Sequence, residues 1–245
     1  MITIYLRFYE ELNDFLPKTQ RKVEFVKDLL LRTTVKDIIE SCRIPHTEVD
    51  LILVNGQSVD FDHKVNNGDK ISLYPMFESI DVSPVIHLQD RPLRNLKYFA
   101  DAPLGKLVRL MRLLGLDVHY DRKITGLEFL ETALKEKRIL ITRNRQLLMP
   151  NKVTHGYCIH SNAPYQQIKE VVRRFDLKQQ LKPYTRCSIC NSKLKKVAKK
   201  GIINLLEPLT KKYYDNFNHC PECGKIYWRG SHYQSLNKLI ESFKR

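Results

Sequence analysis

The stretch LKYFADAPLGKLVRLMRLLGLDVHY, residues 96–120, decides the fold of the larger part of this chain. It opens with a short apolar run that ends in an acid, Asp101. Over 104–115, apolar residues then recur every three or four positions, which is typical of an amphipathic helix. The residues of this apolar face are Leu104, Leu107, Met111 and Leu114. Gly115 is a stop signal, and DVHY at 117–120 follows as a second strand.

The residues that follow continue this alternation of strands and helices. We expect a helix through 128–137, strands at 138–142 and 156–160, and a helix over 164–175 that has Pro164 in its first turn. Strands that alternate with helices predict a parallel sheet with helices on its faces. The chain therefore contains an α/β domain, which we expect at residues 96–180.

Polar residues follow two strands of this expected sheet. In such sheets ligands bind beyond the carboxyl ends of the strands, and Asp101, Arg143 and Asn144 follow those ends. Converging carboxylates hold Mg²⁺ or Mn²⁺, which activates water for phosphodiester cleavage. Asp101 is the best candidate ligand because it ends an apolar strand in a segment poor in acids. Further acids are possible partners, although each taken alone is better explained as a surface acid or a helix cap: Asp117, Asp121 and Glu128.

The net charge of +15 is unevenly distributed. Residues 1–90 hold 10 basic and 15 acidic side chains, whereas residues 91–245 hold 32 basic and 12 acidic side chains. A segment this basic favours a polyanionic partner, and nucleic acid is the leading candidate. The competing interpretation is a basic domain with no such partner. No apolar run reaches 18 residues and the N-terminus lacks a secretory pattern, so we expect no membrane span and a cytoplasmic protein.

Four of the six cysteines form two C-x-x-C pairs, which predict a zinc site. Cys187 and Cys190 are followed, after 29 residues, by Cys220 and Cys223. Four thiolates at this spacing suit a tetrahedral, structural Zn²⁺ site that has no ligand position left for water. A redox pair would explain only one of the two motifs, and disulfides conflict with the expected compartment.

Residues 1–80 predict a separate small domain. Its expected elements are a strand at 2–6, an apolar stretch at 23–31, a helix capped by Thr33 or Thr34, a strand at 51–56 that enters an Asn-Gly turn, and a strand within 66–76. Strand, strand, helix, strand, strand is the β-grasp order. Residues 81–95, with Pro84 and Pro92, are the expected linker.

The segment VNGQSVDFDHKVNNGDKISLYPM, residues 54–76, resembles ubiquitin-like proteins of the ThiS/MoaD sulfur-carrier type. Those carriers act through a C-terminal Gly-Gly. Here the strand runs on into FESIDVSPVIHLQDRP without one, so carrier chemistry is not expected. A module that docks a protein partner or regulates the chain is favoured, and a purely structural role stays open.

Three further blocks resemble the Mut-seven C-terminal RNase family. They are YFADAPLGKLVRLMRLLGLDVHY, RILITRNRQL, and CSIC with CPECGKIYWRGSHY. The resemblance implies a PIN-like α/β fold, a zinc ribbon at 181–245 that includes a C-terminal helix, an N-terminal ubiquitin-like domain, and a metal-dependent ribonuclease.

The chain departs from the acidic pattern of that family at two of three positions. Asp101 keeps the first acid. Thr125 and Gly126 stand where acids are expected, and Asn144 replaces the Asp of a Thr-Arg-Asp. An Asn carbonyl can coordinate Mg²⁺ but supplies no charge, so the expected site is weakened. Asp121 or Glu128 is a possible substitute, and the catalytic residues we predict are Asp101, Asp121 and Asn144.

Basic residues near these positions are candidates for RNA contacts. Lys106, Arg109 and Arg112 recur every three residues on one helix, and a solvated helix face explains them equally well. Arg143 and Arg145 flank Asn144. Beside the second cysteine pair, Arg229 and His232 suit contacts to unpaired RNA, whereas Trp228 is better explained by core packing.

Three functions follow from these patterns. The first is a PIN-like, divalent-metal-dependent ribonuclease acting on RNA. The second is a catalytically degenerate RNA-binding protein that keeps the fold and the zinc. The third is an adaptor that works through its ubiquitin-like domain.

Overall fold

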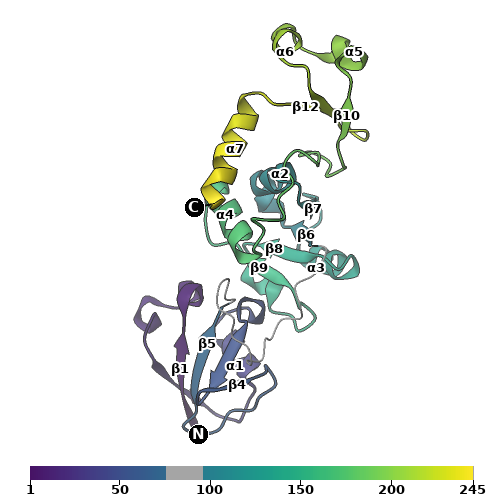
Figure 1. Ribbon diagram of the computed structural model, residues 1–245. Helices are drawn as coiled ribbons and strands as arrows, with labels where there is room; N and C mark the ends of the chain where they lie inside the picture. Colours follow the sequence, from purple (N-terminus) through teal and green to yellow (C-terminus); the bar gives the residue numbers. More distant parts are fainter. Residues whose placement is uncertain (76–95, 245) are drawn as a thin grey trace. The chain divides into compact units, whose positions relative to one another are not determined.

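The computed structural model describes residues 1–75 and 96–244 (Figure 1). The chain forms two compact units. One joins Met1–Asn95 to Thr125–Cys158, and the other joins Leu96–Ile124 to Ile159–Arg245. The linker expected at 81–95 lies outside the described residues.

The first unit contains a five-stranded sheet with the order β2-β1-β5-β3-β4. Its elements are β1 (Ile2–Phe8), β2 (Phe25–Leu29), α1 (Val35–Ser41), β3 (Leu51–Val54), β4 (Gln57–Val59) and β5 (Lys70–Tyr74). Strand β1 is parallel to β5 and antiparallel to β2, and β3 is antiparallel to both β5 and β4. This is the β-grasp arrangement that the sequence predicts, with β4 as an additional short strand.

Alternating residues of the sheet and one face of α1 build the core of this sheet. Ile4, Leu6 and Phe8 are buried from β1, and they share one apolar cluster with Ile38 and Ile39 of α1. Burial of this one face fixes the register of β1, because a slip by one residue would turn the apolar side chains into water.

Helix α1 begins with a capping box. The Thr34 hydroxyl accepts a hydrogen bond from the Asp37 backbone N–H at 3.2 Å, and the Asp37 carboxylate accepts one from the Thr34 N–H at 3.3 Å. Two backbone donors of the first turn are thereby satisfied. The Thr34 hydroxyl also donates to Asp37 Oδ2 at 2.6 Å, and this bond is the largest cause that lowers the pKa of Asp37.

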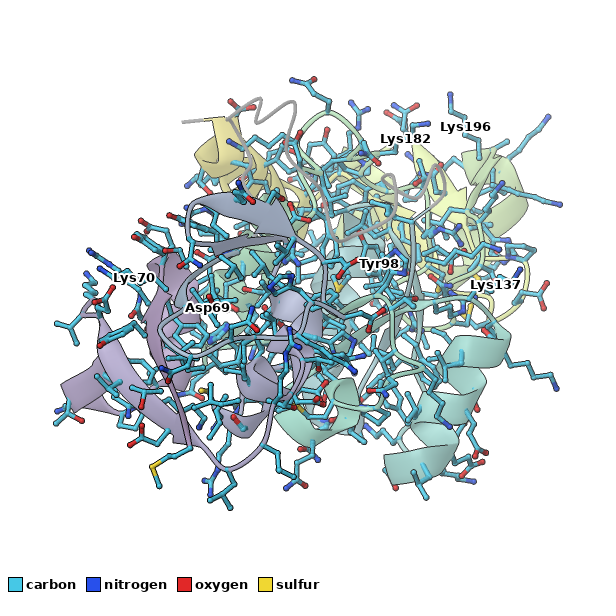
Figure 2. All side chains as sticks on the ribbon, turned by 90° about the horizontal axis from the view of Figure 1, so that it is seen from below. Asp69, Lys70, Tyr98, Lys137, Lys182 and Lys196 are labelled. Carbon is cyan, nitrogen blue, oxygen red and sulfur yellow. The ribbon has the colours of Figure 1, made fainter. Side chains whose placement is uncertain are left out.

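A two-residue turn joins β3 to β4 and is tied to a neighbouring turn. Asn55 and Gly56 have φ values of 52° and 82°, the left-handed geometry of a type I′ hairpin. The Asn55 side chain donates to Asp69 Oδ1 at 2.9 Å, and Asp69 Oδ2 accepts from the Asn66 N–H at 2.7 Å. Asp69 and the adjacent Lys70 are labelled in Figure 2.

The first unit also holds a helix and two strands from the middle of the chain. They are α3 (Gly126–Lys135), β8 (Ile139–Thr142) and β9 (Gly156–Cys158), with the short 3-10 helix η5 (Arg145–Leu148) between the strands. Strands β8 and β9 are parallel, as expected.

Two buried side chains of the β-grasp part contact this middle segment. Both lie in η3 (His46–Glu48), a 3-10 helix that packs on β9. His46 Nε2 lies 2.8 Å from the Val153 carbonyl oxygen, and the Glu48 carboxylate accepts a hydrogen bond from the Cys158 N–H at 2.7 Å. These polar contacts join residues 125–158 to the β-grasp part within the first unit.

The second unit begins with the stretch 96–120. Strands β6 (Lys97–Ala100) and β7 (Asp117–His119) are parallel, and α2 (Gly105–Leu113) joins them. Helix α4 (Pro164–Arg174) packs on α2. Tyr98, labelled in Figure 2, is completely buried, with its ring centroid 5.4 Å from that of Phe175.

Gly115 ends the turn after α2, as its position in the sequence predicts. Its φ is 92°, and a Cβ atom there would lie 2.2 Å from the Lys182 carbonyl oxygen. No other residue fits this close approach without a backbone shift.

The C-terminal part of this unit is a three-stranded antiparallel ribbon followed by a helix (Figure 1). Its strands are β10 (Lys195–Val197), β11 (Phe217–His219) and β12 (Ile226–Trp228). The basic run 193–200 contributes β10, so it forms a ribbon strand. Helices α5 (Lys199–Ile202) and α6 (Pro208–Tyr213) lie between the cysteine pairs, and α7 (Ser231–Lys244) contacts α4.

The expected fold class, α/β with an N-terminal β-grasp domain, a PIN-like parallel sheet and a ribbon, is confirmed. In the described part of the chain, no helix combines the length and the apolar character needed to cross a bilayer.

Candidate active site and cysteine centre

Asp101 is held in place where β6 ends. The apolar residues of β6 are buried, and only 8% of Asp101 is exposed. Its Oδ1 accepts a hydrogen bond from the Ala102 N–H at 2.8 Å, which makes Asp101 the cap of the 3-10 helix η4 (Ala102–Leu104). The local structure therefore fixes a carboxylate at the carboxyl end of a strand of the parallel sheet.

The other acids of this unit have different surroundings. Asp121 is half-buried, and its Oδ1 accepts from the Lys123 N–H at 2.9 Å, the pattern of an Asx turn. Asp117 binds two side chains of the ribbon, Arg186 at 3.0 Å and Asn191 at 2.9 Å. Asp117 thus anchors β7 to the ribbon.

Asn144 lies in the first unit, and Arg143 separates it from the end of β8. Its Oδ1 accepts from the Gln146 N–H at 3.1 Å, so it caps η5, and its own N–H donates to Thr142 Oγ1 at 2.9 Å. Both Arg143 and Asn144 are exposed. The Arg145 guanidinium lies 5.4 Å from the centroid of the Phe15 ring in the β-grasp part.

Neutral residues occupy the start of α3, where the family pattern has acids. Thr125 is the N-cap residue but makes no side-chain capping bond. Gly126 has a φ of 58° and no heavy atom within 4 Å of a Cβ position. Glu128, in the first turn of α3, is exposed.

The four cysteines of the two C-x-x-C pairs converge. All four Sγ atoms lie within 4.8 Å of one another, with Cys187 and Cys223 at 3.5 Å and Cys190 and Cys220 at 3.3 Å. A tetrahedral Zn²⁺ with Zn–S bonds of about 2.3 Å separates its sulfurs by roughly 3.8 Å, so the cluster fits such an ion. Across residues 1–75 and 96–244, these cysteines are the one group of three or more His, Cys, Asp or Glu side chains close enough to share a metal.

Each cysteine pair sits in a knuckle that closes on a left-handed residue. Gly224, with a φ of 73°, donates its N–H to the Cys220 carbonyl at 3.0 Å. Asn191, with a φ of 70°, does the same to the Cys187 carbonyl at 3.0 Å. The two loops therefore have equivalent geometry, although only the second has the glycine that the sequence marks.

Arg112 supports the first knuckle and is not an exposed phosphate contact. Only 4% of it is exposed. Its Nε and Nη2 donate to the Val118 carbonyl at 3.0 and 2.8 Å, and its Nη1 donates to the Ile189 carbonyl between Cys187 and Cys190. Burial lowers the pKa of Arg112, and the neighbouring cysteines oppose that shift.

The remaining basic candidates lie on two surfaces of the second unit. Lys106 and Arg109 are exposed on α2. Arg229 is exposed after β12, with its guanidinium 5.2 Å from the centroid of the Tyr233 ring. His232 lies in α7, and its side chain is outside the described part of the structure. Trp228 packs at a tilt against Phe217 yet remains 38% exposed.

Comparison with known proteins assigns both parts of the chain. The Mut7-C RNAse domain family matches residues 96–240, and the Mut7-C ubiquitin family matches residues 1–81. The chain belongs to the Mut7-C RNase family. Among solved structures, the crystal structure of SAMP1 from Haloferax volcanii has 14% sequence identity and a TM-score of 0.26, and the match covers 31% of this chain and 98% of that one. No curated protein matches the chain.

Several residues of the Mut7-C part are important in ways that the sequence does not indicate. The contacts of Asp117 with Arg186 and Asn191 join positions about 70 apart in the chain. Tyr184 and Tyr233 stack with ring centroids 4.8 Å apart. No local pattern marks either set, because each depends on how the ribbon folds back on the rest of its unit.

Proposed function

We propose that the chain is a divalent-metal-dependent ribonuclease that acts on RNA. The observation that carries this proposal is the buried carboxylate of Asp101 at the end of β6, within the residues matched by the Mut7-C RNAse domain. The excess of 32 basic over 12 acidic side chains after residue 90 supports a polyanionic substrate.

Carboxylate and amide oxygens are ligands that Mg²⁺ and Mn²⁺ prefer, and the predicted residues carry them. Asp101 and Asp121, both in the second unit, would supply charged oxygens. Asn144, which the sequence also predicts as a catalytic residue, lies in the first unit and is tested by its own substitution below. Such an ion, when bound, makes water a stronger nucleophile and offsets charge on the leaving oxygen. Lys106, Arg109, Arg143 and Arg145 would contact phosphates, which positions the strand without reading its sequence.

The proposal is tested with the full chain, Mn²⁺ and an end-labelled single-stranded RNA. We expect Asp101→Asn to lower the cleavage rate by about 100-fold or more, since it removes a charged metal ligand without changing size. Asp176→Asn, at an exposed acid, is the matched control. Equal cleavage by Asp101→Asn and the parent chain would reject this site.

A catalytically degenerate RNA-binding protein is the second candidate, because Thr125, Gly126 and Asn144 are neutral. Asn144→Asp separates the two functions. An enzyme weakened by lost charge should gain cleavage from this substitution. A chain that binds RNA and cleaves it neither before nor after the change is a binding protein.

We further propose that the four cysteines hold a structural Zn²⁺. The converging sulfurs support this, since four thiolates leave no open coordination position for water. These cysteines are thiols and not disulfides, which leaves four sulfurs available as ligands. Metal analysis of the purified chain should give one zinc per molecule, and its absence would remove the assignment.

A protein partner for the ubiquitin-like part is supported by exposed apolar side chains in its edge strand β2 and directly after it. Val26, Leu30 and Leu31 are 56%, 86% and 79% exposed. An edge strand can add a strand from a partner. We expect a partner that is captured by the full chain to be lost when Leu30 and Leu31 are both changed to Asp, whereas unchanged capture would place its site elsewhere.

A further inference from the structure

A groove opens between the ribbon sheet and the start of α7. Its volume is about 710 Å³. It lies well apart in sequence from Asp101, and its walls come from all three ribbon strands, from residues 183–184 and from α7. The residues that matter here are Tyr184, Lys196, Phe217, Trp228, Arg229 and Tyr233.

Aromatic rings form much of this groove. Tyr184 and Tyr233 are stacked with an interplanar angle of 29°, and burial raises the pKa of Tyr184 to about 12, which keeps its hydroxyl neutral. Trp228 leans on Phe217 with the ring centroids 6.5 Å apart, and keeps more than a third of its surface exposed. Large aromatic faces that remain open in a groove are suited to stacking on planar groups.

A close-fitting glycine helps to set the position of the indole. A Cβ atom at Gly230 would lie 2.9 Å from Trp228 Nε1 and 3.2 Å from Cδ1. Glycine therefore lets the chain turn directly beside the ring, which holds Trp228 at the wall of the groove.

The groove is also positively charged. Lys196 and Arg229 line it, and Lys196, labelled in Figure 2, projects from the ribbon. The lining contains one acid, Asp215, which pairs with Lys199 at 2.7 Å. Over 181–245 the sequence holds 14 basic and 4 acidic side chains. The whole ribbon segment thus attracts anions.

Amide side chains supply the remaining polar groups. Asn216, Asn218 and Asn237 line the groove. An amide both donates and accepts hydrogen bonds, so these residues can pair with the edges of nucleobases. Rings, cations and amides together match the three parts of an unpaired nucleotide: base face, phosphate and base edge.

We propose that this groove binds an unpaired stretch of the RNA substrate, with bases stacked on Trp228 and on the Tyr184–Tyr233 pair and with phosphates held by Lys196 and Arg229. A duplex cannot present its base faces in this way, because they already stack on each other. The inference rests on the proposed function in its choice of RNA as ligand, and it extends that function by placing substrate binding on the ribbon.

Trp228 is the single tryptophan of the chain and therefore reports on the groove directly. The zinc-loaded full chain carrying Asp101→Asn, which prevents cleavage during the measurement, is titrated with oligouridylate. We expect saturable quenching of tryptophan fluorescence. An abasic oligomer of equal length and a duplex of equal length should quench weakly and bind less tightly.

Variants then identify the rings. Tyr184→Leu and Tyr233→Leu should each weaken oligouridylate binding by about 5-fold to 100-fold, since stacking on an aromatic side chain contributes that much per base. Tyr213→Leu, at an exposed tyrosine outside the groove, is the control and should bind as the parent does. Unchanged zinc content in each variant shows that the ribbon is intact.

Two results would overturn the inference. One is equal affinity for oligouridylate, its abasic counterpart and polyglutamate, which would mean that the ribbon collects any polyanion, acidic proteins included, by charge alone. The other is parental affinity in both tyrosine variants with intact zinc. If RNA quenches the fluorescence but the parent chain cleaves no RNA, the proposed nuclease function is rejected and RNA binding in the groove is retained. If the parent chain cleaves RNA but no quenching occurs, the nuclease function is retained and binding in the groove is rejected.

Discussion

Replacing Arg112 should destabilise the ribbon, although Arg112 stands among the basic residues of an amphipathic helix. Its guanidinium donates twice to the Val118 carbonyl and once to the Ile189 carbonyl. Arg112→Met keeps the apolar stem and removes all three donors. The carbonyl of Val118, in β7, and that of Ile189, in the first knuckle, then lose hydrogen bonds.

The size of the effect follows from this geometry. An acceptor left without its partner in a buried site costs about 1–3 kcal/mol, so two of them cost roughly 2–6 kcal/mol. Part of this loss in stability is offset, because the variant no longer transfers a charged guanidinium from water into a buried site. We therefore expect a net loss of about 2–4 kcal/mol in the free energy of unfolding of the ribbon.

The assay is urea unfolding of the zinc-loaded chain, followed by the fluorescence of Trp228, which lies on β12 of the ribbon. Arg109→Met is the matched control, because Arg109 is exposed on the same helix three residues earlier. The control should change stability by less than about 0.5 kcal/mol. If the two variants unfold at the same urea concentration, the buried guanidinium does not support the knuckle and the reasoning is wrong.

Three further predictions concern other buried polar groups and the metal. Glu48→Ala should destabilise the first unit by about 1–3 kcal/mol, because the Cys158 N–H loses its acceptor at 2.7 Å. Hydrogen exchange at β9 should rise, and Glu24→Ala, at an exposed acid, should leave it unchanged. Burial lowers the pKa of His46 below its ordinary 6.5, so the unfolded chain binds a proton more readily than the folded chain. The free energy of unfolding should therefore fall as the pH drops below about 6.5. In His46→Gln, the urea midpoint should lose this part of its pH dependence. A strong chelator should unfold the ribbon and shift Trp228 emission to longer wavelength, while the β-grasp core keeps its protection from hydrogen exchange. If the chelator also removes protection from the β-grasp core, zinc does not stabilise the ribbon independently of that core.

The sequence predicts those features that depend on short-range patterns. The capping role of Thr34, the turn at Asn55–Gly56 and the strands around α2 all follow from residues within a few positions of each other. The convergence of the four cysteines is also predictable, because the C-x-x-C spacing constrains each knuckle.

Arg112 shows where a periodic pattern misleads. Three residues along a helix correspond to a rotation of about 300°, so residues six apart differ by roughly 120° in direction. Lys106 and Arg109 can therefore face water while Arg112 has already turned toward the ribbon. The spacing alone gives no sign of this, since only the packed knuckle at Ile189 shows which side of α2 is covered.

His46 and Glu48 show a second limit. Their partners, Val153 and Cys158, lie more than 100 positions later in the chain. Both residues are polar, and a sequence pattern places them on the surface of a small ubiquitin-like domain. They are buried because the β-grasp part and the segment 125–158 pack together, so the N-terminal domain is better studied in the full chain than as an isolated fragment.

Backbone geometry decides at which of the neutral positions an acid can be introduced without strain. Gly126 has a φ of 58°, and an L-residue there costs about 1 kcal/mol or more in backbone strain, so Gly126→Asp would confuse loss of stability with gain of charge. Asn144 has a φ of −98° and acts as a helix cap through its side-chain oxygen. Aspartate has the same shape and caps equally well. Asn144→Asp therefore changes the charge after β8 while the fold is preserved, which makes any change in cleavage a measure of charge at this position rather than of folding.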